Sequence, residues 1–382
     1  MMKIGIEAHT IEKQEKLGAG GNYLGQILKE WSKLNPDEYQ FILYFKDRIP
    51  TDEFLNKPIF KKRIAKIPGV SSTMLFYNLL FPLRAFFDKL DVLFLPFYMR
   101  PFFCFNRKII TSIHDIFFKP HPEWCSWRYR YPYLILTKLA VKSSRAIIVC
   151  SRSTKKEIIK YYKVDPNKIH VVYLAAGEEF NSNKDFLRIE KAKGKYGLNK
   201  KYLFFTGTIL NRRHVLESMQ AFEKLLEKGL DYQFLISGRD FTRCPVQKID
   251  KEAERINYRF PNAIKRIRYI DSEDLISIYQ DTELLVWLSE YEGFGLPPLE
   301  AMACGTPVLT TKMTSLAEVL GDYPIAINNP SDVEEIKEKM IKALSNEQLK
   351  NEMIEKGLER VKQFSWRQTI AETLKILTHE LL

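Results

Sequence analysis

The 382-residue sequence is poor in cysteine and has no long apolar run. Its five cysteines are scattered without a C-x-x-C pair, which argues against a disulfide framework or a zinc ribbon. A bilayer-spanning helix needs about 20 apolar residues, whereas the longest candidate, residues 74–83, contains Asn78 and precedes Arg84. The N-terminus lacks the apolar core of a signal peptide. We therefore expect a cytoplasmic protein that does not cross a membrane.

The composition also lacks the bias of disordered or fibrous chains. Hydrophobic residues make up 45% and charged residues 28%, as in folded globular proteins. At about 150 residues per domain, the length predicts two domains, each with its own core. A cleft between domains is then a reasonable place for a site.

Positive charge is concentrated in one half of the chain. Residues 1–176 contain 29 Lys and Arg against 15 Asp and Glu, whereas residues 177–382 contain 30 against 32. A positive field attracts polyanions or an acidic lipid surface, so we expect the first half to face an anionic partner. A lysine-rich solvated surface is the alternative explanation.

Short β-branched or aromatic runs alternate with segments of helical length. This alternation is typical of βαβ units and parallel sheets, and predicts an α/β protein with two doubly wound, Rossmann-like halves. Nearly apolar strands indicate helices on both faces. The predicted strands are residues 3–7, 41–45, 92–95, 109–113, 146–150, 202–205, 233–236, 284–288 and 308–310.

Polar residues mark the ends of several elements. Thr154-x-x-Glu157 and Ser315-x-x-Glu318 are predicted capping boxes at helix starts. The polar stretch 176–201 is the predicted linker between the halves. Amphipathic helices are predicted at 334–344, 347–363 and 366–382.

The strongest motif begins after the apolar run at 284–288. It reads Glu292-Gly293-Phe294-Gly295-Leu296-Pro297-Pro298-Leu299-Glu300 and continues as Ala301-Met302-Ala303-Cys304-Gly305-Thr306-Pro307-Val308. Pro297 suits a first helical turn. The free N–H groups of such a helix start, together with glycine backbone, favour a phosphate-bearing ligand at the sheet edge. Two carboxylates eight residues apart can accept hydrogen bonds from hydroxyls on different parts of that ligand.

A second element follows the strand at 202–205. The run from Thr206 to His214 places Gly207 close to Arg212 and Arg213, just before a predicted helix from about residue 215. Arginine can bind phosphate through two parallel hydrogen bonds, so adjacent guanidinium groups beside a glycine turn favour an anion site.

Together these motifs resemble glycosyltransferase family four, the retaining enzymes of the GT-B fold with an E-x7-E signature. The resemblance implies two Rossmann-like domains facing a central cleft. It implies that Glu292 contacts the transferred sugar and that Glu300 holds the nucleotide ribose. The remaining donor-binding roles fall on Phe294, Gly295 and Leu296, on Gly207, and on Arg212 and Arg213. The sequence departs from the family pattern with Arg213 in place of Lys and His214 in place of Asn.

The first half contains two further matches. The run Leu17-Gly18-Ala19-Gly20-Gly21-Asn22-Tyr23 resembles the Gly-rich first loop of the family, which assigns Gly21 to donor binding. His114 closes the strand at 109–113 and resembles a strand-terminal catalytic histidine. The resemblance implies an acceptor-binding domain at 1–175, a nucleotide-sugar-binding domain at 176–365, and a last helix at 366–382 that packs back on the first domain.

The implied reaction moves a hexose, with mannose as the hypothesis, from a GDP or UDP sugar to a glycan or lipid-linked acceptor. Catalysis by His114, Glu292 and Arg213 would proceed with retention, and the leaving phosphate would take the acceptor proton. Neither a cofactor nor a metal is expected, since Asp271-Ser272-Glu273-Asp274 is predicted to begin a helix. A further hypothesis is peripheral contact with the inner face of the plasma membrane through Lys57, Lys61, Lys62, Arg63, Lys66 and the aromatic stretches 76–87 and 94–105. The alternative is that these aromatic residues belong to core helices and strands.

Two other classes of protein stay open. A phosphorylase or a sugar-nucleotide epimerase would share the fold, although a phosphorylase needs a pyridoxal-phosphate lysine that the sequence does not reveal. A nucleic-acid-binding protein is suggested only by the isoelectric point of about 9.2. No helix-turn-helix or RNP-like motif supports it, so no nucleic-acid partner is expected.

Overall fold

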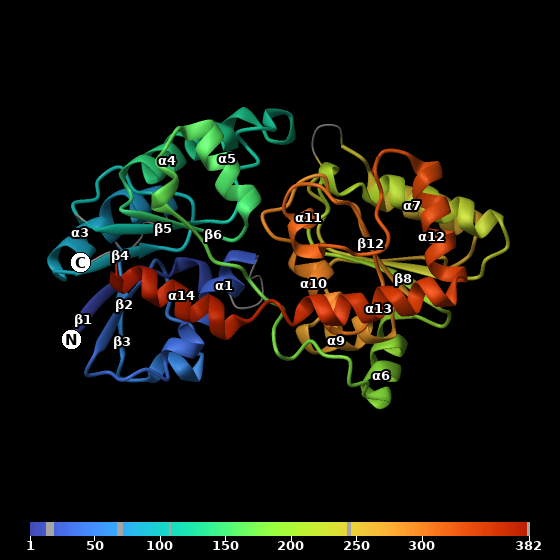
Figure 1. The fold of residues 1–382 in the computed structure, drawn as a ribbon, viewed down its shortest axis with the longest axis horizontal. Coiled ribbons are helices and arrows are strands. Elements are labelled where there is room, and N and C mark those ends of the chain that lie inside the picture. The colour runs from blue at the N-terminus through green and yellow to red at the C-terminus, as the bar shows by residue number, and fades with distance from the viewer. Residues whose placement is uncertain (13–18, 67–71, 107, 243–245, 380–382) are drawn as a thin grey trace. The chain divides into compact units, whose positions relative to one another are not determined.

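The computed structural model describes residues 1–12, 19–66, 72–106, 108–242 and 246–379, and these form two compact units (Figure 1). The first unit is drawn from Met1–Pro122, Ser126–Leu174 and Trp366–Leu382. The second unit consists of Glu123–Cys125 and Ala175–Ser365. No helix among the described residues is both long and apolar enough to cross a bilayer.

The first unit contains a parallel seven-stranded sheet of order β3-β2-β1-β4-β5-β6-β7. Its strands are β1 (Met2–Glu7), β2 (Tyr39–Phe45), β3 (Phe60–Ile64), β4 (Val92–Leu95), β5 (Ile109–Ile113), β6 (Ala146–Val149) and β7 (Ile169–Val171). Its helices include α1 (Ala19–Trp31), α2 (Thr73–Leu75), α3 (Phe81–Phe87), α4 (Trp127–Ser143), α5 (Arg152–Tyr162) and α14 (Trp366–His379). A π-helical turn, η4 (Phe76–Leu80), joins α2 to α3.

The second unit contains a parallel five-stranded sheet of order β10-β9-β8-β11-β12. Its strands are β8 (Tyr202–Thr206), β9 (Gln233–Ser237), β10 (Ile264–Ile267), β11 (Leu284–Trp287) and β12 (Val308–Thr310). Its helices are α6 (Phe186–Tyr196), α7 (Val215–Glu227), α8 (Ile249–Arg259), α9 (Ser272–Asp281), α10 (Leu296–Ala303), α11 (Ser315–Leu320), α12 (Val333–Ser345) and α13 (Glu347–Val361).

Each sheet has a point where the strand order reverses. In the first sheet the chain adds β2 and β3 on one side of β1 and then returns to place β4 on its other side. In the second sheet β11 returns beside β8 in the same way. A crevice outside the carboxyl ends of the two strands is where doubly wound folds bind ligands.

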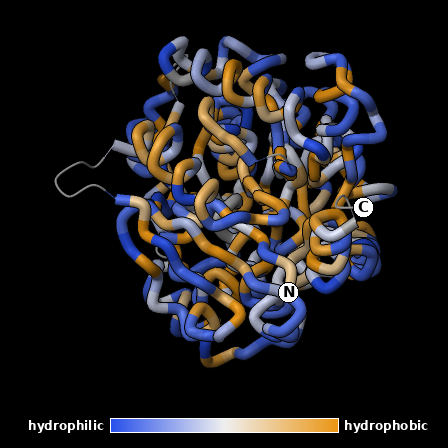
Figure 2. Tube along the Cα trace, turned by 90° about the vertical axis from the view of Figure 1, so that its left-hand side faces the viewer, coloured by the Kyte–Doolittle hydropathy of each residue, from blue (hydrophilic) through white to orange (hydrophobic). Residues whose placement is uncertain are grey.

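Apolar side chains explain why the inner strands form. Every residue of β4, β6 and β11 is buried, and burial of apolar surface stabilises by roughly 25 cal/mol per Å². In Figure 2 the helical turns alternate between hydrophobic and hydrophilic colours, as expected for helices that cover a sheet with one face. The predicted α/β class with two parallel sheets is therefore confirmed.

Three strands were not predicted, and all three have a polar or mixed sequence. They are β3, β7 and β10, each at the edge of its sheet. Their burial is partial, because an edge strand has only one neighbouring strand. Segment β3 carries Lys61, Lys62 and Arg63, which the sequence presented only as a basic cluster.

Both predicted capping boxes are wrong. Helix α5 begins earlier than expected, at Arg152, and Ser151 is its N-cap, with a hydroxyl that accepts the N–H of Thr154 at 3.0 Å. At α11 the N-cap is Thr314, whose side chain makes no cap hydrogen bond. The hydroxyl of Ser315 instead donates to carbonyl oxygens of the neighbouring loop. A local sequence pattern could not reveal the tertiary partners of Ser315.

The polar stretch 176–201 is more than a linker, because it contains α6. Asp185 caps this helix through the N–H of Arg188, and Gly197 ends it in the left-handed conformation at φ 67°. The three predicted C-terminal helices form as α12, α13 and α14. Within the first unit, Thr369 of α14 donates to the carbonyl oxygen of Tyr173, and α14 contacts α1.

Candidate active site

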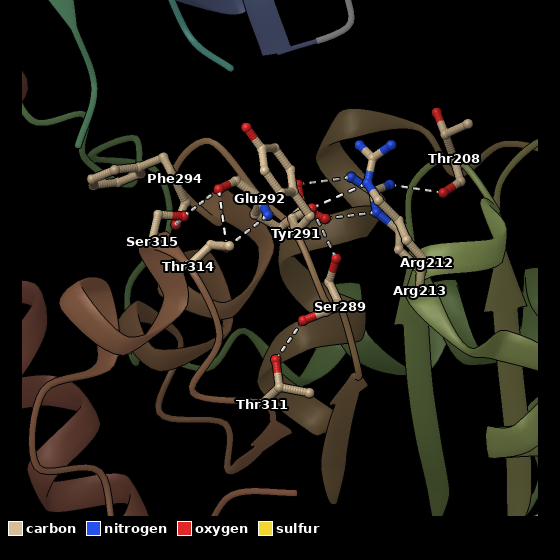
Figure 3. A network of polar contacts seen from close by, with 10 residues as sticks. All are labelled: Thr208, Arg212, Arg213, Ser289, Tyr291, Glu292, Phe294, Thr311, Thr314 and Ser315. Atoms are coloured by element: carbon tan, nitrogen blue, oxygen red, sulfur yellow. Dashed lines mark hydrogen bonds and ion pairs between the residues drawn. The ribbon is translucent and has the colours of Figure 1, made fainter. Parts of the chain in front are cut away.

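The reversal point of the second sheet brings the two strongest motifs together. Strands β8 and β11 are hydrogen-bonded neighbours, with Leu203 opposite Leu284. The loop after β8 carries the arginines, and the loop after β11 carries the acidic Gly-rich segment (Figure 3). Because both strands are parallel, both loops leave from the same edge of the sheet.

A two-point ion pair joins the loops. Arg213 Nε donates to Glu292 Oε1 at 2.8 Å, and Arg213 Nη2 donates to Glu292 Oε2 at 3.2 Å (Figure 3). Arg213 Nη1 also donates to the carbonyl oxygen of Thr208 at 2.7 Å. A guanidinium group has five N–H donors. The three bonds use three of these donors and leave two that make no hydrogen bond to the described residues.

The ring of Trp287 lies against the guanidinium group of Arg213. The Arg213 guanidinium carbon lies 4.4 Å from the Trp287 ring centroid, as in a cation–π contact. Gly207 adjoins both groups: a Cβ there would lie 3.3 Å from the Trp287 ring and 3.5 Å from Arg213 Nη1. Its φ of 109° also disfavours any L side chain. Gly207 therefore leaves room for this stacked arginine.

Arg212 ties the two loops through their backbones. Its Nε donates to the Tyr291 carbonyl oxygen at 3.1 Å, and its own carbonyl accepts the N–H of Glu290 at 2.9 Å. Arg212 is 8% exposed. The buried Arg212 side chain therefore supplies positive charge from inside the two connected loops.

Hydroxyl groups hold the Glu292 backbone in place. Its N–H donates to Thr314 Oγ1 at 3.1 Å, and Ser315 Oγ donates to its carbonyl oxygen at 2.7 Å (Figure 3). Burial raises the pKa of this carboxyl, but the charges of Arg213 and Arg212 outweigh burial and hold the pKa below its ordinary value. Glu292 is therefore ionised at neutral pH.

The second glutamate of the motif has a different environment. Glu300 lies in α10, whose N-cap is Gly295 with φ 106° and whose first turn contains Pro297. Burial raises the pKa of Glu300 to about 7, and the nearby Glu179 adds to the shift, although Tyr279 opposes it by donating a hydrogen bond at 3.2 Å. This carboxyl therefore gains or loses its proton close to neutral pH. Phe294 and Gly295 of the intervening loop are buried, and Leu296 is half-buried.

His214 belongs to the same cluster, and the sequence showed it only as a departure from the family pattern. It adopts the left-handed conformation at φ 46° and forms the N-cap of α7. Its Nε2 lies 2.5 Å from Glu290 Oε1, and its Nδ1 lies 3.3 Å from Glu217 Oε1. Burial lowers the pKa of His214, but the hydrogen bonds and charges of Glu217 and Glu290 outweigh it and raise the pKa to about 9.

The other candidate residues lie in the first unit. His114 directly follows β5, and its ring packs edge-on against Tyr23 at 4.7 Å. Burial lowers the pKa of His114 to about 4, so the ring is neutral. Its Nε2 is buried and makes no hydrogen bond to the described residues. Gly21 lies inside α1, which begins at Ala19, and residues 17 and 18 of the predicted loop lie outside the described residues.

The structure thus groups Gly207, Arg212, Arg213, Glu292 and the start of α10 at one sheet edge. Among the described residues, no cluster of three or more His, Cys, Asp or Glu side chains is arranged to hold a metal ion. The acidic run at the start of α9 has protein partners instead, since Asp271 and Asp274 bind Lys195 Nζ at 2.5 and 2.6 Å.

Two family models match the chain. Residues 188–360 match "Glycosyl transferases group 1", and residues 36–176 match "Glycosyltransferase Family 4". Together the two matches cover most of both units.

Individual relatives and one solved structure agree with these matches. The chain is 29% identical over 274 residues to the O-antigen chain mannosyltransferase B of Escherichia coli, a match that covers 70% of this chain and 69% of the relative. It is 32% identical over 265 residues to the serotype-specific mannosyltransferase WbdA of Escherichia coli, covering 69% of this chain but only 32% of WbdA. The structure of Anabaena HepE in complex with UDP and glucose superposes with a TM-score of 0.73 at 15% identity, over 99% of this chain and all of HepE.

The His214 ion pairs predict a loss of stability as the pH rises. The folded-state pKa of about 9 lies above the ordinary value of 6.5, so the contribution is full below pH 6.5 and disappears as the pH rises through 9. The expected decrease in the free energy of unfolding is at most about 3 kcal/mol. Urea unfolding of native protein and of His214→Asn between pH 7.5 and 9.5 measures this decrease. Asparagine is the chosen substitution because it tolerates the left-handed backbone and does not titrate.

The chosen pH interval avoids the titration of Glu300, whose raised pKa reduces stability between pH 4.5 and about 7. Native protein should lose stability across the interval, whereas His214→Asn should lose clearly less. Equal slopes for the two proteins would show that His214 is not held in its charged form.

Proposed function

Because the chain belongs to glycosyltransferase family four and has the GT-B fold, we propose that it transfers a hexose from a nucleotide sugar to a glycan or lipid-linked acceptor. The proposed pathway is the synthesis of a cell-surface polysaccharide. The similarity to O-antigen mannosyltransferases supports this choice and favours mannose as the sugar. The chain spans about a third of the length of WbdA, so the substrates of that larger protein are carried over here only as a proposal.

The observation that carries the proposal is the arginine pair at the β8–β11 edge. A departing nucleoside diphosphate develops negative charge, and preorganised positive groups stabilise that charge best. Arg213 has two N–H donors left after its bonds to Glu292 and Thr208. The contact with Trp287 restricts the movement of the guanidinium group that carries those donors. We assign Arg213, supported by Arg212, to the diphosphate.

The two glutamates are assigned to different parts of the donor. The ionised Glu292 carboxylate can accept hydrogen bonds from hydroxyls of the transferred hexose, close to the diphosphate-binding Arg213. Glu300, eight residues later and hydrogen-bonded to Tyr279, is assigned to the ribose hydroxyls. Backbone N–H groups of Phe294, Gly295 and Leu296 complete the proposed diphosphate and sugar contacts.

The proposed transfer retains the configuration at the anomeric carbon. The bond from the anomeric carbon to the phosphate oxygen breaks, the acceptor oxygen forms the new bond on the same face, and the leaving phosphate takes the acceptor proton. Neutral His114, whose buried Nε2 makes no hydrogen bond to the residues that the structure describes, is assigned to hydrogen-bonding the reacting sugar. No metal or cofactor enters the proposed steps.

A donor screen tests the proposal as a whole. Thermal shift measurements with UDP, GDP, ADP and dTDP sugars should show stabilisation by one donor, with GDP-mannose expected, since a ligand at about 100 times its Kd stabilises by about 2.7 kcal/mol. Proton NMR of the product formed from that donor should then show the same anomeric configuration as the donor. Absence of any stabilising donor, or an inverted product, would contradict the proposal.

Substitution of Arg213 tests the diphosphate assignment. Arg213→Ala should lower kcat/KM by a factor that corresponds to roughly 2–3 kcal/mol, the scale of a lost charged hydrogen bond. Arg213→Lys should retain more activity, because it keeps the charge and loses only the two-point geometry. Arg188→Ala, in an exposed ion pair with Asp185, is the matched control and should behave as native protein.

Because Arg213→Ala also leaves the Glu292 carboxylate without its partner, thermal unfolding of this variant is measured beside its kinetics. The variant should remain impaired for donor binding even when thermal unfolding shows an intact fold. A loss in kcat/KM below about tenfold would argue against a phosphate role for Arg213.

We also propose that the first unit docks on an anionic membrane surface at the inner face of the plasma membrane. Five phenylalanines of the predicted aromatic stretches are more than half exposed: Phe86, Phe87, Phe102, Phe103 and Phe105. Phe86 lies 5.6 Å from Phe87 and 5.7 Å from Phe105. Other rings of these stretches, including Phe76, Phe81 and Phe94, belong to the buried core.

Basic residues lie beside this aromatic group. The ion pair between Arg63 of β3 and Asp88, at the end of α3, joins the basic strand to the helix that carries Phe86 and Phe87. Exposed apolar rings with flanking cations suit the interface of an acidic bilayer.

Vesicle co-sedimentation tests the docking surface. Native protein should bind phosphatidylglycerol vesicles at low salt and bind phosphatidylcholine vesicles less, and binding should weaken as salt rises. Phe87→Ser/Phe103→Ser should reduce binding, whereas Phe186→Ser, which removes an exposed ring from the second unit, should not. Equal binding by the double variant and native protein would refute this surface.

A further inference from the structure

The first sheet has its own reversal point, between β1 and β4, and Glu7 is the last residue of β1. Crevices outside the carboxyl ends of such strands are the ligand sites of doubly wound folds. The residues that leave this edge are Glu7 and His9 after β1, and Phe97 and Tyr98 after β4. His114 follows β5, two strands away from β1 and therefore about 10 Å along the edge.

Only one oxygen of the Glu7 carboxylate accepts hydrogen bonds from the described residues. Its side chain is fully buried. Oε1 accepts the N–H of His9 at 2.8 Å and also contacts His9 Nδ1. Oε2 is buried and accepts no hydrogen bond from the described residues. Since a buried acceptor without a donor costs about 1–3 kcal/mol, a purely structural role does not explain this oxygen.

A neighbouring buried glutamate shows what a structural carboxylate looks like in this unit. Both oxygens of Glu12 accept backbone N–H groups: Oε1 accepts those of Lys46 and Asp47, and Oε2 accepts that of Asp47. Glu12 is 6% exposed. The contrast identifies Glu7 Oε2 as a buried acceptor without a donor among the described residues, which a ligand hydroxyl would supply.

The His9 side chain is partly accessible to solvent. It is 25% exposed, and its ring packs against Phe76 at 5.7 Å and Tyr77 at 6.3 Å. Both aromatic residues belong to the π-helical turn η4, and such turns are frequent at functional sites. Burial lowers the pKa of His9, but Glu7 outweighs burial and raises the pKa above its ordinary value.

Aromatic rings continue from β4 toward His114. Tyr98 contacts Tyr133 at 5.2 Å and Phe97 at 6.3 Å, and Phe97 contacts His114 at 6.4 Å. Phe97, Tyr98 and Tyr133 are all partly exposed. Aromatic faces with a few fixed polar groups are typical of sites that bind and orient small molecules.

We propose that Glu7 and His9, together with the aromatic residues after β4, form a binding site for a pyranose unit of the acceptor glycan. Glu7 Oε2 accepts a hydrogen bond from a sugar hydroxyl, His9 fixes the carboxylate, and Phe97 and Tyr98 pack against the apolar faces of the ring. An anionic ligand does not suit a site whose open atom is a carboxylate oxygen. The assignment rests on the proposed glycosyl transfer and names the residues that recognise the acceptor.

The test separates acceptor recognition from donor chemistry. The probe is the octyl glycoside that native protein glycosylates fastest in a panel of octyl hexosides. Glu7→Gln keeps the size of the side chain but replaces the open acceptor by an amide. It should raise the KM for this glycoside roughly tenfold or more, the scale of a lost charged hydrogen bond. Hydrolysis of the nucleotide sugar without acceptor should stay within about twofold of native.

Glu12→Gln is the matched control, since it alters a nearby buried glutamate with no open oxygen. It should lower thermal stability without raising the acceptor KM. If Glu7→Gln does not fold, Tyr98→Leu provides the second variant, and it should also raise the acceptor KM.

The outcomes distinguish this inference from the function on which it rests. If Glu7→Gln folds and its acceptor KM is unchanged, the proposed acceptor site is wrong. If Glu7→Gln does not fold, an unchanged acceptor KM in Tyr98→Leu leads to the same conclusion. Normal nucleotide-sugar hydrolysis in the same experiment would leave the proposed transferase chemistry standing. Native protein that neither hydrolyses a donor nor glycosylates any glycoside overturns both.

Discussion

The candidate active site depends on the ion pair between Arg213 and Glu292. Burial alone would favour a protonated Glu292, and the adjacent arginines reverse that preference. The carboxylate in turn orients the guanidinium through two hydrogen bonds. The Thr208 carbonyl oxygen accepts a third, and the remaining two N–H groups make no hydrogen bond to the described residues. The pair therefore presents an ionised acceptor and a fixed cation side by side, which is what a hexosyl diphosphate requires.

The fold produces this pair from residues that are 79 positions apart in the chain. Strands β8 and β11 become neighbours because the chain reverses its direction of strand addition at that point. The carbonyl oxygens of Arg212 and Tyr291 then tie the two following loops together. Gly207 provides the space in which Trp287 and Arg213 stack.

The first sheet repeats this construction with different chemistry. Its reversal point carries, in place of arginines, partly exposed aromatic rings and a carboxylate of which only one oxygen accepts hydrogen bonds from the described residues. The arginines at the edge of the second sheet suit a diphosphate. The edge of the first sheet, with a hydrogen-bond acceptor and aromatic faces, suits an uncharged sugar. The difference in charge between the two sheet edges therefore matches the proposed assignment of one edge to the donor and the other to the acceptor.

Much of the fold could be predicted from the sequence, because burial on both faces makes the inner strands continuously apolar. The edge strands β3, β7 and β10 were missed, because strands with one neighbour tolerate residues such as Lys61 and Arg63. The motif residues Arg213 and Glu292 could be selected singly, but their pairing depends on the order of the strands.

The roles of Glu7 and His214 depend on tertiary contacts in the same way. No local pattern distinguishes the open oxygen of Glu7 from the satisfied oxygens of Glu12. The histidine at position 214 was visible in the sequence, but the two carboxylates that keep it charged, Glu217 and Glu290, come from different elements.

The central claim is that Arg213, oriented by Glu292, binds the donor diphosphate. A crystal structure of the protein with its nucleotide-sugar donor tests this most directly. The account predicts diphosphate oxygens within about 3 Å of the Arg213 guanidinium nitrogens, with the hexose next to the Glu292 carboxylate. A donor bound elsewhere, with both side chains free of ligand contact, would contradict the account.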